Sequence, residues 1–118
     1  MAVAAGISLS AAIPASATSY CPGGSGSCFF YNSNRGGAVH AYSASTPNFD
    51  GDVFADGGAG DGVPVKNNAA SAANDTYSFT MRVYYNSNYA GVYDDVAPSS
   101  WRNLVKTKNN NASLRLFQ

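Results

Sequence analysis

The sequence predicts an all-β fold assembled from two copies of one supersecondary unit. The segment FYNSNRGG at residues 30–37 recurs as YYNSNYAG at residues 84–91. Downstream of each copy, KNNAAS at residues 66–71 recurs as KNNNAS at residues 108–113. No window of twelve residues combines a helical period with capping residues, and every acidic residue is Asp, which favours turns over helices. Two ordered repeats of this kind indicate a duplicated β unit.

The beginning of the chain has the composition of an export signal. Residues 1–17 are small, apolar and uncharged, and they close on Ala15-Ser16-Ala17, an Ala-x-Ala cleavage pattern. The basic segment that opens a complete signal peptide is missing, so we interpret residues 1–17 as a signal-peptide remnant. The stretch is also too short to anchor the chain in a membrane. We therefore expect a secreted, extracellular protein.

Two cysteines follow the signal-like segment. Cys21 and Cys28 are the only cysteines, and in an oxidising compartment they should form one disulfide. This bond would tie an N-terminal tail, residues 18–27, to the first strand. A zinc site is excluded because His40 is the only histidine. The pair is interpreted as structural, and it would reinforce the modest core of a small domain.

Strands are predicted where apolar and aromatic residues alternate or cluster between turns. Cys28–Tyr31 and Ala38–Tyr42 flank the first Asn-Ser-Asn turn and are rich in aromatic and β-branched residues. Tyr77–Tyr84 and Ser113–Leu116 alternate apolar and polar residues with period two, which is typical of half-buried strands. Over residues 98–104 we expect a single short helical turn.

The two units differ in length between their repeated segments. Phe30 and Asn67 are 37 positions apart, whereas Tyr84 and Asn109 are 25 positions apart. The first unit thus holds twelve additional residues, which we place in the Gly- and Asp-rich stretch 47–64. A long loop in a compact domain is in most cases either functional or mobile, and both interpretations stay open at this point.

The repeated segments resemble the two signatures of the βγ-crystallin family. The family's hairpin signature is an aromatic residue, four residues, a second aromatic, one residue and a glycine. Tyr84, Tyr89 and Gly91 match it in full, whereas the first unit has Arg35 in place of the second aromatic. The second signature, Asn/Asp-Asn/Asp-x-x-Ser/Thr-Ser, is followed at five of six positions in both units. The resemblance implies a sandwich of two Greek keys. It divides the single domain 28–118 into Greek key 1, about 28–75, and Greek key 2, about 76–118.

Secreted microbial members of that family include small metallopeptidase inhibitors of the streptomycete type. The chain is similar to them in mature size, in its N-terminal cysteine pair and in both signatures, although only one disulfide can form. The resemblance implies a secreted, monomeric bacterial inhibitor of an extracellular peptidase, a metallopeptidase, that binds through an exposed loop. Such an inhibitor must offer an apolar side chain to the enzyme. We expect Val53 and Phe54, within the stretch 47–64, to supply this contact.

The resemblance also implies weak calcium binding by the two Asn-rich segments. Each ion would draw oxygens from both segments, and the expected ligands are Asn67, Asn68, Ser71, Asn109, Asn110 and Ser113. Because the leading residues are neutral, we expect dissociation constants of about 0.1–1 mM. The same residues would also serve to terminate strands by bonding local backbone groups. A calcium-binding structural or toxin-like module without inhibitory activity is the alternative function.

The composition argues against several other classes of function. The formal charge is zero and the cations are dispersed, which gives no basic surface for nucleic acid. The chain has no Glu and one histidine, and it lacks a Gly-x-Ser-x-Gly elbow, a paired-histidine zinc motif and a phosphate loop. Acid–base chemistry therefore lacks its usual residues, so we predict no catalytic site and no enzymatic activity.

Overall fold

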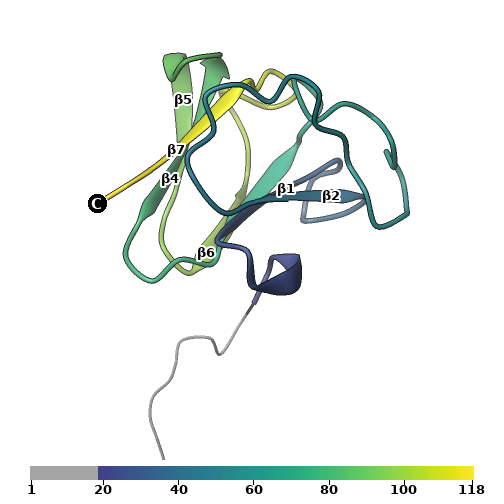
Figure 1. The fold of residues 1–118 in the computed structure, drawn as a ribbon, viewed down its shortest axis with the longest axis horizontal. Coiled ribbons are helices and arrows are strands. Elements are labelled where there is room, and N and C mark those ends of the chain that lie inside the picture. Colours follow the sequence, from purple (N-terminus) through teal and green to yellow (C-terminus); the bar gives the residue numbers. More distant parts are fainter. Residues whose placement is uncertain (1–18) are drawn as a thin grey trace, which may run out of the picture.

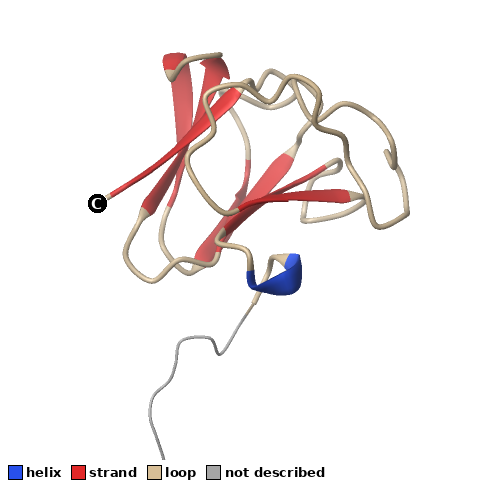
Figure 2. Ribbon diagram, in the orientation of Figure 1, coloured by secondary structure: helices blue, strands red, loops and turns tan. Residues whose placement is uncertain are grey.

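The computed structural model describes residues 19–118 and shows two packed β-sheets (Figures 1 and 2). The elements are the 3-10 turn η2 (Pro22–Gly24) and the strands β1 (Ser27–Phe30), β2 (Val39–Tyr42), β3 (Ser71–Asn74), β4 (Thr80–Asn86), β5 (Ala90–Val96), β6 (Ser100–Asn103) and β7 (Ser113–Phe117). The first sheet has the order β2-β1-β3-β6, and the second sheet has the order β5-β4-β7. All neighbouring strands are antiparallel. The predicted all-β sandwich is confirmed.

Each sheet takes a segment from the other half of the chain. Strand β6 belongs to the second repeat, yet it pairs with β3 of the first, with Ala73 opposite Trp101. In return, Thr46 of the first repeat bridges to Leu114 of β7 through two hydrogen bonds of 2.9 and 3.0 Å. Neither sheet is complete without the opposite repeat. Because each repeat contributes a segment to the sheet of the other, the two Greek keys are joined by backbone hydrogen bonds.

Both repeated Asn-Ser-Asn segments fold into the same tight hairpin. Arg35 and Tyr89 occupy equivalent left-handed positions, with φ values of 60° and 58°. The glycines two residues later also have positive φ, 78° at Gly37 and 88° at Gly91. At Gly91 a Cβ would lie 2.7 Å from the side-chain nitrogen of Asn86, so both the space and the backbone require glycine. The repeat in the sequence is therefore also a repeat in backbone conformation.

The core between the sheets is formed by large side chains of both repeats. Phe29 of β1 packs edge-on against Phe49, with ring centroids 5.1 Å apart, and Tyr42 stacks on Phe49 at 4.9 Å. From the second sheet, Met81 and Leu114 are fully buried in the same cluster. Burying a side chain of this size stabilises the fold by about 1.5–3 kcal/mol, so this cluster is the main source of hydrophobic stabilisation.

Three strands differ from what the local sequence predicts. Residues 98–104, expected to form a helical turn, instead contain β6, because the edge of β3 offers this segment backbone partners along its length. The sequence reasoning also did not find β3 or β5. Strand β3 has the sequence SAAN, which lacks β-branched and aromatic residues, yet all four residues are buried between β1 and β6. Tertiary placement thus overrides local propensity.

The N-terminal tail is held by a disulfide and by a carboxylate. Cys21 and Cys28 are bonded as predicted, with their Cα atoms 5.6 Å apart. Asp75 accepts hydrogen bonds from the backbone N–H groups of Tyr20 and Cys21, at 3.0 and 2.7 Å. The predicted signal-peptide remnant, residues 1–17, lies outside the described residues. Within residues 19–118, no helix is long and apolar enough to cross a bilayer.

Candidate functional site

Ser71 and Ser113, both predicted as calcium ligands, are buried where a strand meets a repeated hairpin. The Ser71 hydroxyl donates to the Asn32 carbonyl at 2.7 Å and accepts from the Arg35 backbone N–H at 3.0 Å. Ser113 makes the equivalent contacts in the second repeat, donating to the Asn86 carbonyl at 2.7 Å and accepting from a hairpin N–H at 3.1 Å. Both hydroxyls therefore clamp a hairpin onto its sheet.

Two polar cavities lie beside these hairpins and are related by the repeat. The first cavity has a volume of about 360 Å³ and the second about 300 Å³. Each is lined by one hairpin, by the Asn-rich segment that follows this hairpin, and by a Lys-Asn pair from the opposite segment. The first cavity is lined by residues 31–33 and by Asn68, Ala70, Lys108 and Asn109. The second cavity is lined by residues 85–87 and by Asn110, Ala112, Lys66 and Asn67.

The structure brings the four asparagines predicted as calcium ligands to these cavities. Asn68 and Asn109 share the first cavity, and Asn110 and Asn67 share the second. The backbone N–H groups of Asn67 and Asn109 each donate across to the opposite segment, at 2.8 and 2.9 Å. The two predicted serine ligands line neither cavity, because their hydroxyls are turned into the hairpins. The segments thus meet in exchanged pairs, as the family resemblance implies.

Neither cavity has the donor set of a calcium site. Ala70 and Ala112, next to the clamp serines, offer no side-chain oxygen, and each cavity is lined by a lysine, Lys108 or Lys66. No carboxylate lines either cavity, and residues 19–118 hold no group of three His, Cys, Asp or Glu side chains suited to a metal. An ammonium about 5 Å from a calcium ion costs about 2 kcal/mol even at the dielectric constant of water. Because calcium affinity depends on ligand charge, the residues present do not fit the ion.

The stretch 47–64, predicted as a contact loop, is ordered by its own backbone hydrogen bonds. The N–H of Phe54 donates to the Val63 carbonyl at 2.9 Å, and the N–H of Gly62 returns to the Phe54 carbonyl at 2.8 Å. These bonds give the stretch the form of a hairpin-like loop, although it contains many glycines. The stretch is therefore held by regular backbone contacts, and whether it is functional stays a prediction.

The two residues predicted to contact a peptidase lie on opposite sides of this loop. The structure corrects the prediction for Phe54: the ring is 1% exposed and packs edge-on against Tyr31 at 5.8 Å. Val53 is 44% exposed, and its carbonyl is bonded to Nδ1 of His40 at 2.8 Å. Neighbouring side chains of an extended segment face opposite sides, so only one of the pair could have been exposed. Phe54 anchors the loop, and Val53 lies on its surface.

The tip of the loop rests on the first hairpin. The N–H of Ala38 donates to the Ala59 carbonyl at 2.8 Å. Gly60, with φ at +86°, lies against the ring of Tyr31, where a Cβ would overlap the ring atoms. Only glycine fits both the backbone conformation and the space. At this position the glycine serves close contact rather than mobility.

A sequence comparison now identifies the family. The sequence model of peptidase inhibitor family I36 matches residues 14–96, which include the first hairpin, the whole loop and strands β1 to β5. The chain belongs to peptidase inhibitor family I36. No curated protein sequence matches the chain at a significant level.

The solved structures that resemble this member of family I36 are βγ-crystallin domains. A structure described under the evolution of the eye lens βγ-crystallin domain fold has a TM-score of 0.62 at 9% identity, covering 79% of this chain and 85% of that one. The N-terminal domain of protein S has a TM-score of 0.60 at 19% identity, covering 80% and 97%. A βγ-crystallin from an archaeon has a TM-score of 0.52 at 20% identity, covering 78% and 96%. At these identities the likeness shows the fold alone, and it confirms the predicted βγ-crystallin-type sandwich.

Arg35 is the residue at which this family I36 chain departs from the βγ-crystallin hairpin signature. Its guanidinium lies between the rings of Tyr20 and Trp101, 4.8 and 4.9 Å from their centroids. A cation over an aromatic face contributes about 0.5–2 kcal/mol, depending on how far water is excluded. Arg35 thus links the N-terminal tail to β6, a role that the aromatic residue at the equivalent position of the second hairpin does not have.

The outer face of the second sheet carries a surface that the sequence reasoning missed. Arg82 of β4 lies over the rings of Tyr93 and Phe117, 3.8 and 4.8 Å from their centroids, and forms a two-pronged pair with Asp95 at 2.8 and 2.9 Å. The sequence does contain a signal for this surface, because the period-two alternation that predicts β4 also places Arg82 and Tyr84 on the face opposite the core. Arginine and aromatic residues are enriched in protein interfaces, so this face is a further candidate contact surface.

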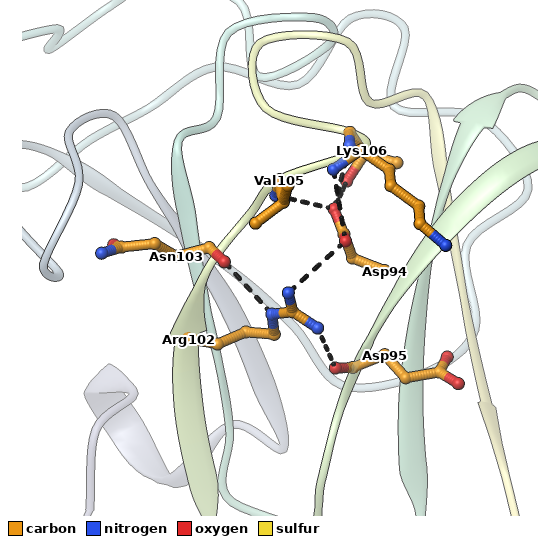
Figure 3. A network of polar contacts seen from close by, with 7 residues as sticks. Asp94, Asp95, Arg102, Asn103, Val105 and Lys106 are labelled. Carbon is orange, nitrogen blue, oxygen red and sulfur yellow. Dashed lines mark hydrogen bonds and ion pairs between the residues drawn. The ribbon is translucent and has the colours of Figure 1, made fainter.

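Asp94 of β5 organises the turn after β6, as Figure 3 shows. Its carboxylate accepts the N–H groups of Val105, Lys106 and Thr107 at 3.0, 3.3 and 2.9 Å, and the Thr107 hydroxyl at 2.8 Å. A nitrogen of Arg102 lies 3.6 Å away. Burial by itself would raise the pKa of Asp94, but the hydrogen bonds from Thr107 and its neighbours outweigh it and lower the pKa below 3.8. The network holds the segment that leads into the second Asn-rich repeat.

Proposed function

We propose that this protein is a secreted inhibitor of an extracellular metallopeptidase and that it binds the enzyme through the loop 47–64. The match to peptidase inhibitor family I36 carries the proposal, because it spans residues 14–96 and so includes that loop whole. Family membership implies a peptidase partner. The metallopeptidase class rests on the resemblance to inhibitors of the streptomycete type, and the inhibitor requires no chemistry of its own.

The rigidity of the loop supports this role. Association costs free energy for every segment that becomes ordered on binding. Phe49, Phe54 and Val65 are buried at 1% exposure or less, and together with the backbone hydrogen bonds they fix the loop in the free protein. A cross-linking disulfide, which this loop lacks, is therefore not needed for a preorganised contact.

The exposed side of the loop has the composition that an enzyme cleft would accept. Val53 is the large apolar side chain that the loop exposes, and the tip beyond it consists of small and acidic residues. An extended segment with one apolar side chain suits the apolar specificity pocket of a thermolysin-type enzyme. We assign Val53 to that pocket, with Phe54 as its anchor inside the protein.

Secretion is the remaining part of the proposal. The Cys21–Cys28 disulfide supports it, since such bonds persist in oxidising compartments outside the cytosol. The Ala-x-Ala pattern at residues 15–17 supports it independently, because signal peptidases cleave after small residues in this arrangement.

The test is inhibition of a thermolysin-type metallopeptidase by the full chain, with a serine and a cysteine peptidase in parallel. Val53→Asp should raise the inhibition constant at least about tenfold, because an unpaired carboxylate would be buried in an apolar pocket. Val105→Asp is the matched control, since Val105 is 70% exposed and lies outside the loop. Thermal melts of both variants establish that they are folded.

Each outcome decides a separate part of the proposal. Equal inhibition constants for the two variants would refute contact through Val53. Inhibition of the serine or cysteine peptidase without inhibition of the metallopeptidase would refute the target class. Retention of the chain in the cytosol of the producing cell, measured by fractionation, would refute secretion.

A further inference from the structure

The two polar cavities are equivalent in every part of their lining. Each is built from a hairpin of one repeat and from both Asn-rich segments, and the two linings carry the same residue types in the same places. Asn68 and Asn110 correspond, as do Asn109 and Asn67. A cation lying in either cavity would meet amide oxygens and would join the two repeats. Each cavity therefore gathers neutral polar groups from both repeats around one space, with no carboxylate among its lining residues.

Each cavity is also lined by one lysine, Lys108 in the first and Lys66 in the second. The ammonium of Lys66 donates to the side-chain oxygen of Asn48 at 3.2 Å. The same oxygen accepts the hydroxyl of Ser87 at 3.4 Å, and Ser87 belongs to the hairpin that lines the second cavity. Through Asn48, the positive charge of Lys66 is held between the loop 47–64 and the second hairpin. Lys108, the equivalent residue of the second repeat, lines the first cavity.

We infer that Lys66 and Lys108 take the place of bound cations, so that the sandwich closes without calcium. An ammonium supplies positive charge beside the neutral oxygens of each lining, and that of Lys66 donates to Asn48, which also accepts from Ser87 of the second lining. Because it is part of the chain, its presence does not depend on the concentration of any ion. The ammonium also repels a metal ion from the same cavity. Because no metal ion has to be held there, neither lining needs a carboxylate.

The test is the melting temperature of the full chain in calcium, in magnesium and in a chelator. At about 10 mM calcium the wild-type melting temperature should move by less than about 1 °C relative to the same concentration of magnesium. Lys66→Asp and Lys108→Asp each place a carboxylate beside two asparagines. Each should create a site with a dissociation constant near 1 mM, which gives a calcium-specific rise of about 5 °C.

Lys106→Asp is the matched control, because Lys106 is exposed and lies outside both linings but undergoes the same change of charge. A calcium-specific rise of more than about 2 °C in the wild type would overturn the inference. So would a response of Lys66→Asp and Lys108→Asp no larger than that of Lys106→Asp, since the cavities would then have no geometry for a cation. Peptidase inhibition is not measured in this experiment, so neither outcome depends on the proposed function.

Discussion

Replacing Asp94 with asparagine should remove the charge that holds the turn after β6 while keeping the size of the side chain. One carboxylate oxygen accepts the N–H of Val105 and both donors of Thr107, whereas the other faces the N–H of Lys106 and a nitrogen of Arg102. An asparagine oxygen can keep the first three contacts, but its NH₂ group then points at two donors. The side chain is 3% exposed, so water cannot compensate.

The expected loss follows from these contacts. Hydrogen bonds to a charged group contribute about 1.5–3 kcal/mol each, and a buried donor left without a partner costs about 1–3 kcal/mol. Losing one acceptor and weakening three other contacts gives a destabilisation of about 3 kcal/mol for Asp94→Asn. For a domain of this size, that lowers the melting temperature by about 12 °C or more. Asp95→Asn is the control: its pair with Arg82 is 38% exposed at the carboxylate and should contribute less than about 1 kcal/mol.

The dependence on pH supplies a second check. Because the pKa of Asp94 is lowered below 3.8 in the folded protein, its stabilisation is present above that pH and is lost as the pH falls toward the folded value. Urea unfolding of wild type and Asp94→Asn should therefore differ by about 3 kcal/mol at about pH 7, and the difference should shrink as the pH falls below 3.8. A difference that stays constant with pH, or an Asp94→Asn variant as stable as Asp95→Asn, would refute the reasoning.

The remaining predictions concern the hairpin clamps and the loop tip. Ser71→Ala and Ser113→Ala each remove two hydrogen bonds between a buried hydroxyl and a hairpin, so each should cost about 2 kcal/mol in urea unfolding. A loss below about 0.5 kcal/mol in either variant would contradict the clamp. Gly60→Ala should weaken peptidase inhibition about tenfold, because the tip must lift from the hairpin beneath it. Gly62→Ala is its control, since Gly62 has a similar φ of +84° and nothing within 4 Å of a Cβ; equal inhibition by the two variants would show that the contact at Gly60 is irrelevant.

The parts of the fold that could be predicted are those set by residues close in the chain. The hairpins need two left-handed residues and a glycine within a few positions, and this requirement is written in the repeated segments themselves. The disulfide follows from two cysteines only seven positions apart. Strand β4 has a period-two pattern because one of its faces is buried and the other is not. In each case the signal is local.

The candidate site could be predicted only in part. The Asn-rich segments were expected to meet, and they do, but which of their residues face a cavity depends on the pairing of segments from opposite repeats. The serines were assigned to a metal because hydroxyls suit calcium, whereas the hairpins take both hydroxyls as clamps. Phe54 was assigned to a partner because an inhibitor must offer an apolar side chain to the enzyme, whereas the core accepts its ring.

By itself, the sequence determined that this protein is a duplicated β unit with glycine-dependent hairpins and a disulfide-linked tail. Only the tertiary structure decided that β6 and Thr46 exchange sheets, that the long loop is fixed from within, and that a lysine lines each polar cavity. The physical reason is the range of the interactions. A turn is decided by the dihedral preferences of adjacent residues, whereas burial and cavity lining are decided by segments that lie tens of positions apart.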